Sequence, residues 1–282
     1  MSCATQPIPE SLKLLQDQGP VRLELKPEVG FGDLTDYRSR TITKTFTDGQ
    51  ISRKQSAGVD FTVETKVTHV DPVNKIGTYQ LTTIEKEGST DLSDFAMPEL
   101  GETFEYVISS EGQVLRAGNM PIGTLYYVPP ISLPKEEVRV GDSWPLTADW
   151  VSLKSNIPLR MELVSILKNF RSCGEVGTCA EIEVSGDVVI SGMQSHVLTS
   201  RTKNEQDPKL RFRSEIHGRL LLSLKKGSVL YSIMRSNESL SGEKDSVQIS
   251  SCLLSFVTKP ESDKVLVREA TECNPLAAIP TF

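Results

Sequence analysis

The stretch FTVETKVT, residues 61–68, decides the fold class of this chain. Phe61, Val63 and Val67 alternate with polar side chains, so an extended backbone places the apolar groups on one face and the polar groups on the other. One face of such a strand can be buried while the other stays in water. The stretch therefore predicts a half-buried antiparallel β-strand.

The same period of two recurs along most of the chain and predicts an all-β protein. Leu159, Met161 and Leu163 alternate with charged neighbours, and a later stretch, residues 212–222, follows the same pattern. Turn-forming pairs separate these stretches at Asp48-Gly49, Asp71-Pro72, Glu111-Gly112, Gly141-Asp142, Gly186-Asp187 and Lys226-Gly227. We expect antiparallel meanders that form a curved or half-barrel-like sheet, preceded by one short helix over residues 11–18.

Two pairs of short segments indicate an internal duplication. Residues 75–79 resemble residues 175–179, and residues 110–115 resemble residues 225–230. A true duplication and the pattern that any two hairpins share both remain open. Trp144 precedes a proline, and we expect its ring to be buried as an anchor. The predicted domains are residues 1–19 as a tether with the short helix, 20–118 as a first β meander, 119–150 as a proline-rich connector and 151–282 as a second meander with a C-terminal tail.

Bulk composition excludes several classes of protein. The chain has 282 residues, of which 38% are hydrophobic and 24% are charged, as in ordinary globular domains rather than disordered chains. No apolar run approaches the roughly 20 residues of a transmembrane helix, so we expect membrane attachment only through a lipid. A net charge of −6 without a long basic block argues against nucleic acid as a partner.

Four of the five cysteines lie in the second half of the chain, where two disulfides would use all of them. Cys173 and Cys179 bracket a glycine-containing hairpin tip, and a bridge from Cys252 to Cys273 would tie the last long strand to the tail. Neither pair has the spacing of a zinc ribbon, which leaves free buried thiols as the main alternative. Loop-closure entropy predicts stabilisation of about 2 kcal/mol for the first bridge and about 3 kcal/mol for the second.

The sequence does not predict a catalytic or metal-binding constellation. Ser143 follows Gly-Asp, as the nucleophile does in one esterase family, but neither His196 nor His217 is preceded by aspartate at the spacing of that family's base. His69, the third histidine, has no partner at metal-ligand spacing. We therefore expect no catalytic residue, metal or cofactor, and a hydrolase with a nonstandard site is the minor alternative.

A charged stripe on one predicted strand is the candidate polar face. Arg211, Arg213, His217 and Arg219 fall on the same side of an extended chain. Two interpretations remain open for this stripe. It is either an ordinary solvent-facing strand surface or a surface that meets an anionic polymer of the cell envelope.

The N-terminal residues resemble the mature start of a bacterial lipoprotein. Ser2, Cys3 and Ala4 precede a polar, proline-containing stretch. This resemblance implies a lipid on Cys3 and a location at the outer membrane, facing the periplasm. A cytoplasmic location is the alternative. Diacylation together with a third acyl chain anchors a protein stably in a membrane, whereas a single acyl chain gives only marginal anchoring.

Three further segments carry a resemblance to a family. Residues 23–27, 67–77 and 138–144 together resemble uncharacterised bacterial β-rich secreted proteins and lipoproteins. The chain is also similar, in architecture only, to the half-barrel carriers that handle lipids or lipoproteins in the bacterial envelope. The lipoprotein-like start, the lack of a catalytic constellation and the repeated strand pattern together predict a non-enzymatic scaffold that binds an envelope protein, a polymer or an apolar ligand. The similarity to half-barrel carriers implies, as the alternative, a carrier of a hydrophobic ligand or lipid.

Overall fold

The structure is a computed structural model, and it describes residues 13–118, 132–151, 158–190, 197–198, 210–242, 244–259 and 273–276. Within those ranges every long element is a β-strand, which confirms the all-β prediction. Two short 3₁₀ turns, η2 (Leu92–Phe95) and η4 (Gly174–Val176), interrupt the strands. The strands are β1 (Gly32–Thr47), β2 (Gln50–Asp71), β3 (Ile76–Gly88), β4 (Thr103–Ser109), β5 (Val114–Ala117), β6 (Ser143–Val151), β7 (Pro158–Ser172), β8 (Thr178–Ile190), β9 (Val197–Leu198), β10 (Leu210–Ser223), β11 (Ser228–Ser241) and β12 (Asp245–Lys259).

All the strands belong to a single antiparallel sheet, in the order β5-β4-β3-β2-β1-β12-β11-β10-β8-β7-β6, with β9 beside β10. The first and last long strands, β1 and β12, pair with each other and so join the two predicted meanders into one sheet. Strands β5 and β6 are its two edges. Each meander advances across the sheet in the same direction, the arrangement that a duplicated unit would have.

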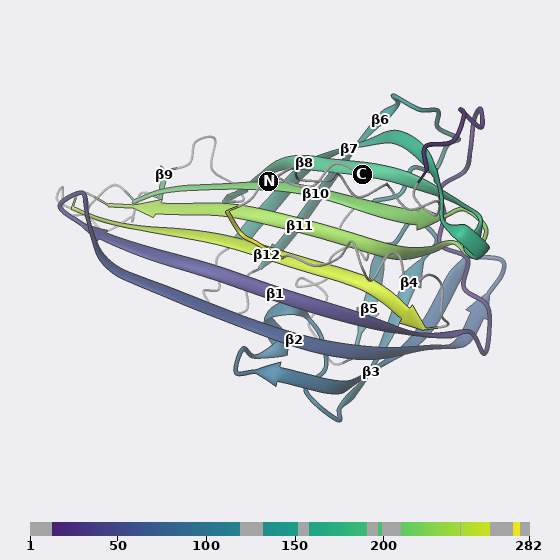
Figure 1. Cartoon of the computed structure of the whole chain (residues 1–282), viewed down its shortest axis with the longest axis horizontal. Helices are drawn as coiled ribbons and strands as arrows, with labels where there is room; N and C mark the ends of the chain where they lie inside the picture. The colour runs from purple at the N-terminus through teal and green to yellow at the C-terminus, as the bar shows by residue number, and fades with distance from the viewer. Residues whose placement is uncertain are drawn as a thin grey trace, which may run out of the picture.

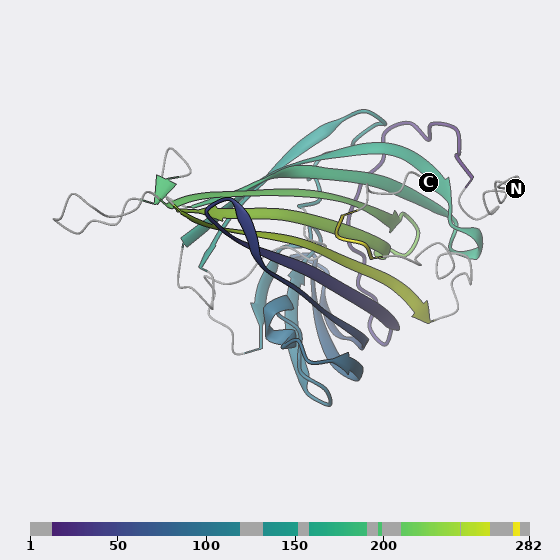
Figure 2. The ribbon, with the colours of Figure 1, turned by 60° about the vertical axis from the view of Figure 1, so that its left-hand side comes forward.

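The sheet is strongly curved. Its long strands converge at one end, on the left of Figure 1, and spread at the other. After rotation, the blue strands β3–β5 and the teal strands β7 and β8 lie on opposite sides of the curve (Figure 2). We call the concave side, which carries Phe61 and Leu163, the inner face, and the opposite side the outer face. The curved-sheet prediction is therefore confirmed.

The predicted helix over residues 11–18 is not formed, and that prediction is wrong from Lys13 onward. Leu14 forms an antiparallel bridge with Arg171 of β7, and the Leu15 N–H donates to the Phe170 carbonyl at 2.9 Å. An isolated helix of two turns is marginal in water, whereas pairing with an existing strand satisfies the same backbone groups. The segment is therefore extended.

The following segment, residues 21–31, crosses the inner face near the hairpin turns, and we call it the N-terminal strap. Its backbone bonds to both meanders: the Leu25 N–H donates to Ser110 at 2.8 Å, and the Lys26 N–H donates to Gly227 at 3.0 Å. A Cβ at Gly227 would lie 2.4 Å from the Lys26 nitrogen, so this close approach requires glycine. The strap therefore links the turn of one meander to the turn of the other.

Two apolar clusters of the described residues, one in each meander, lie on the inner face beside the strap, and another, which includes Leu221, Tyr231 and Phe256, lies on the outer face. Leu23 is 1% exposed and packs in the cluster of the second meander, while Leu25 packs against the clusters of both meanders. Trp144 is buried as predicted, and its Nε1 donates to the Ser132 carbonyl at 2.5 Å. The predicted apolar faces are buried at Phe61, Val63, Val67, Leu163, Leu220 and Leu222, whereas Leu159 and Met161 are half-buried. Trp144 belongs to β6, so the last part of the predicted connector is a strand that pairs with β7.

Candidate functional site

The inner face continues beyond the strap toward the end where β1 finishes and β10 begins. Two rows of directly paired residues cross it there, and we call them the distal inner face. The first row is Thr43, Ile249, Glu238, Ser214, Val188 and Met161. The second row is Thr41, Ser251, Ser236, Ile216, Gly186 and Leu163. The rows run from β1 through β12, β11, β10 and β8 to β7.

The distal inner face mixes aliphatic and hydroxyl side chains. Ile249, Ile216 and Met161 are half-buried, so each keeps part of its apolar surface exposed. Hydroxyl groups lie between them, and Thr41 Oγ1 and Ser251 Oγ form a hydrogen bond at 3.2 Å across β1 and β12. Such a surface offers apolar contact together with a few fixed polar groups, as ligand sites in proteins do.

Glu238 is the charged residue of these two rows. Burial raises the pKa of its carboxyl group, and a hydrogen bond from Ser236 Oγ, 3.5 Å from Oε1, acts in the opposite direction. Its direct neighbours across the strands are Ser214 and Ile249. Glu238 thus supplies the carboxyl group of a partly apolar surface. This group is protonated more readily than the carboxyl group of an exposed glutamate.

A second inner-face carboxyl group, Asp33, lies near the strap. Burial raises its pKa from 3.8 to about 6, while hydrogen bonds from the Thr65 and Thr35 hydroxyls and the charge of Lys226 lower it. The Thr35 hydroxyl donates to Asp33 Oδ1 at 3.3 Å. Burial, together with the Asp33 charge, raises the pKa of Tyr79 to about 12. Asp33 is therefore a half-buried acid whose carboxyl group is poorly solvated.

The structure disperses the predicted polar face of β10. Arg213 is exposed and forms an ion pair with Glu215, and His217 is also exposed. Arg219 is only 8% exposed, and its Nη1 lies 3.4 Å from Glu181 Oε1. The side chain of Arg211 lies outside the described residues. Arg213, His217 and Arg219 thus share one side of the strand but not one environment.

The buried member of this stripe belongs to a charge cluster that the sequence did not predict. Arg171 Nε donates to Glu181 Oε2 at 2.6 Å, so Glu181 lies between two arginines from β7 and β10. Glu181 itself is 2% exposed. Such a cluster depends on the pairing of β8 with both neighbours, which no local pattern reveals.

The other predicted chemical groups are separated in the fold. Ser143 is the first residue of β6 and pairs with Ile166, whereas His69 lies in β2 and His217 in β10. Among the described side chains, no hydrogen bond joins Ser143 to a histidine, and no group of three or more His, Cys, Asp or Glu has metal-binding geometry. His196 lies outside the described residues.

The structure contains both disulfides that the sequence predicts. Cys173–Cys179 closes the β7–β8 turn around η4, and Cys252–Cys273 joins β12 to the short tail segment 273–276. Cys3 lies outside the described residues, so the lipid on it stays a prediction. In the part of the chain that is described, no helical segment has the length and apolar character needed to cross a membrane.

Comparisons with known proteins do not place the chain in a family. No family model matches it, and no curated protein matches it. One solved structure to which it is similar is the crystal structure of the outer membrane protein OprG from Pseudomonas aeruginosa, at 8% identity over 82% of this chain and 94% of that chain. The TM-score is 0.18, which is too low to carry an argument about fold or function. The family resemblance of the sequence therefore stays a prediction.

Proposed function

We propose that this chain is a non-enzymatic binding protein of the bacterial cell envelope, and that its distal inner face holds the hydrocarbon part of an amphiphilic ligand. The observation that carries the proposal is the register of the two rows. It aligns half-buried Ile249, Ile216 and Met161 with hydroxyl groups across a concave surface of six strands.

The lining favours a ligand with both apolar and polar parts. An alkyl chain on this surface would cover aliphatic groups that are now partly exposed, with a gain of roughly 25 cal/mol per Å² of apolar area. The hydroxyls and Glu238 would meet its polar group. A protein or polymer partner, which the sequence also favoured, would use a broader surface and tolerate single changes in these rows better.

The proposed location follows from the N-terminal resemblance. A lipid on Cys3 would hold the sheet at the outer membrane, where amphiphilic ligands are present. Native mass spectrometry of protein taken from its source membrane measures both a lipid adduct on Cys3 and any retained ligand. A Cys3→Ser variant should lose the adduct and leave the membrane fraction, and an unmodified cytosolic wild-type protein would contradict the proposed location.

Binding can be measured with a neutral fluorescent probe, N-phenyl-1-naphthylamine, displaced by monoolein. We expect saturable binding that Ile249→Asp weakens by about tenfold or more, because a carboxylate there removes apolar contact and adds charge beside Glu238. The matched control is Val164→Asp on the outer face of β7, where the valine is 45% exposed. Equal binding by both folded variants, or no displaceable binding by the wild type, would contradict the proposal.

A further inference from the structure

The outer face of β11 contains a buried arginine without a partner. Arg235 is 6% exposed, and within the described part of the chain its Nε and Nη1 atoms are buried and make no hydrogen bond. Guanidinium groups in such surroundings are normally paired, because an unpaired buried charge is strongly unfavourable. Arg235 is therefore the most conspicuous unsatisfied group on this face.

The charges around Arg235 do not neutralise it. Its direct neighbours across the strands are His217 on β10 and Cys252 on β12, and the next residue in that row is Arg40 on β1. The carboxylate of Asp60 is already paired with Arg40, whose Nη2 donates to it at 2.9 Å. Glu181 is likewise held between two other arginines. Glu215, two residues from His217 on the same face of β10, is paired with Arg213. Each of these carboxylates thus already has a cationic partner, which leaves Arg235 able to accept an additional anion.

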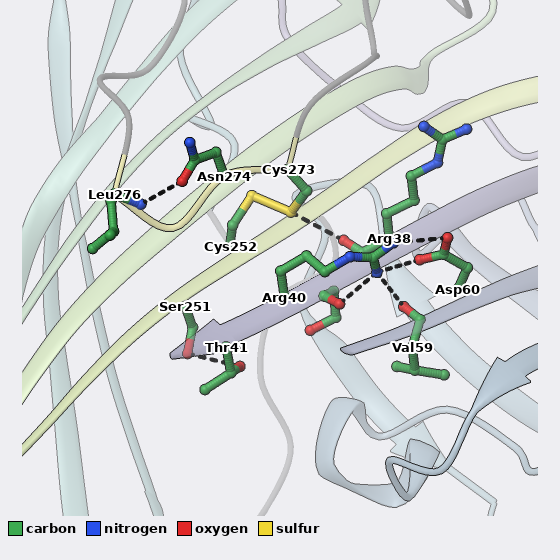
Figure 3. Close-up of a disulfide and its surroundings, with 11 residues drawn as sticks. Arg38, Arg40, Thr41, Val59, Asp60, Ser251, Cys252, Cys273, Asn274 and Leu276 are labelled. Atoms are coloured by element: carbon green, nitrogen blue, oxygen red, sulfur yellow. Dashed lines mark hydrogen bonds and ion pairs between the residues drawn. A yellow bond between two sulfur atoms is a disulfide. The ribbon is translucent and has the colours of Figure 1, made fainter. Parts of the chain in front are cut away.

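A disulfide lies next to Arg235 on the β12 side. Cys252 is the residue opposite Arg235, and its bridge to Cys273 holds the tail segment against the outer face, where Cys273 Sγ contacts the Arg38 carbonyl at 3.3 Å (Figure 3). Apolar side chains of the cluster that includes Ile233 and Leu254 surround the bridge. The opposite side is bordered by His217, which is exposed. An anion would thus approach from β10 and meet a guanidinium in poorly hydrated surroundings.

We propose that Arg235 is the centre of an oxyanion-binding site on the outer face, and that the site takes a phosphate group, free or in a lipid headgroup. A guanidinium offers several N–H donors in fixed directions, which suits an ion with several acceptor oxygens. The imidazole of His217 borders the route of entry and supplies a further donor. Burial lowers the pKa of Arg235 through desolvation, and a bound anion would oppose that effect. The site is on the other side of the sheet from the proposed amphiphile surface and does not depend on it.

The test uses the full chain with both disulfides intact and measures binding of inorganic phosphate by isothermal titration calorimetry against chloride of equal ionic strength. We expect Arg235→Met to weaken phosphate binding at least tenfold. The matched control is Arg213→Met. Arg213 lies on the outer face as Arg235 does, but on β10, and it is exposed and paired with Glu215. It should bind phosphate as the wild type does. Arg235→Lys, which keeps a charge, should retain weakened binding and covers the case in which the methionine variant does not fold.

A second measurement distinguishes the sources of the phosphate group. Sedimentation with phosphatidylglycerol vesicles, with phosphatidylcholine vesicles as reference, reports on a lipid headgroup, and competition by inorganic phosphate shows that the same site is used. Arg235-dependent binding in either format supports the site. No phosphate or vesicle binding by the wild type, or binding that Arg235→Met and Arg235→Lys leave unchanged, would overturn it.

Discussion

The strap end and the distal end of the inner face are made from the same strands but are filled differently. At the strap end, Leu23 from the N-terminal segment belongs to the same apolar cluster as Leu220, and both side chains are at most 1% exposed. At the distal end, Ile249 and Glu238 are half-buried. Within the same two rows Leu163, Val188 and Ser214 are buried, so the partly exposed part of the concave face lies mainly over β1, β12 and β11. We therefore expect substitutions at the strap end to cost more stability than substitutions on these three strands.

The largest expected effect is the loss of the tryptophan anchor at the strap end. Replacing Trp144 with alanine removes a buried ring and its hydrogen bond to the Ser132 carbonyl, and should lower the free energy of unfolding by about 3 to 5 kcal/mol. Urea denaturation followed by circular dichroism measures this change. An unchanged midpoint would mean that the strap end does not carry the stability of the fold.

The two disulfides differ in the length of chain that each one closes. Removing Cys252–Cys273, which closes a separation of 21 residues, should destabilise the protein by about 3 kcal/mol. Removing Cys173–Cys179, with a separation of 6, should destabilise it by about 2 kcal/mol. Urea denaturation of two double Cys→Ala variants, one for each disulfide, measures the two losses of stability. The reverse order would show that the short bridge constrains more than its own turn.

A pH dependence should identify the half-buried carboxyl group of Asp33 near the strap. Asp33 has a folded pKa of about 6 against an ordinary value of 3.8, so the native state keeps a proton that the unfolded chain releases. Stability should therefore fall as pH rises from about 4 to about 6, by about 2 to 3 kcal/mol, and change no further from this group above about pH 7. Asp33→Asn should remove this decrease, and parallel profiles for the variant and the wild type would refute the assignment.

The smallest stability effect is expected at the distal end. Ile249→Ala should destabilise the protein by only about 1 kcal/mol, because the side chain is not fully buried, whereas Leu220→Ala should lie in the range of about 2 to 5 kcal/mol. Denaturation of the two variants side by side measures the difference. Equal losses would show that the distal inner face is core and would remove the basis for placing a ligand there.

Several features of the fold were predictable from local pattern. Alternation at Phe61, Val63 and Val67 predicted which side chains are buried, since burial on one face requires a period of two. The cysteine spacing predicted both disulfides, and the proline after Trp144 suggested an anchor. The helix over residues 11–18 was wrong because its backbone finds partners on β7, a strand far away in sequence, and local periodicity carries no record of such a partner.

The candidate sites were less predictable, because each depends on long-range register. The charged stripe on β10 was visible, but its buried member, Arg219, could not be told from its exposed member, Arg213, without the position of Glu181 on the next strand. Arg235 gave no signal at all, since an arginine in an alternating strand normally faces solvent.

The sequence by itself determined that the chain forms antiparallel strands with defined inner and outer side chains, because strand periodicity and turn chemistry act between residues close in the chain. Only the tertiary structure decided that β1 and β12 join two meanders into one curved sheet and that the strap fills one end of it. It also placed Glu238 beside Ile249 and Arg235 beside Cys252. These arrangements arise from backbone pairing between distant segments, where one shift in register would turn every side chain to the other face.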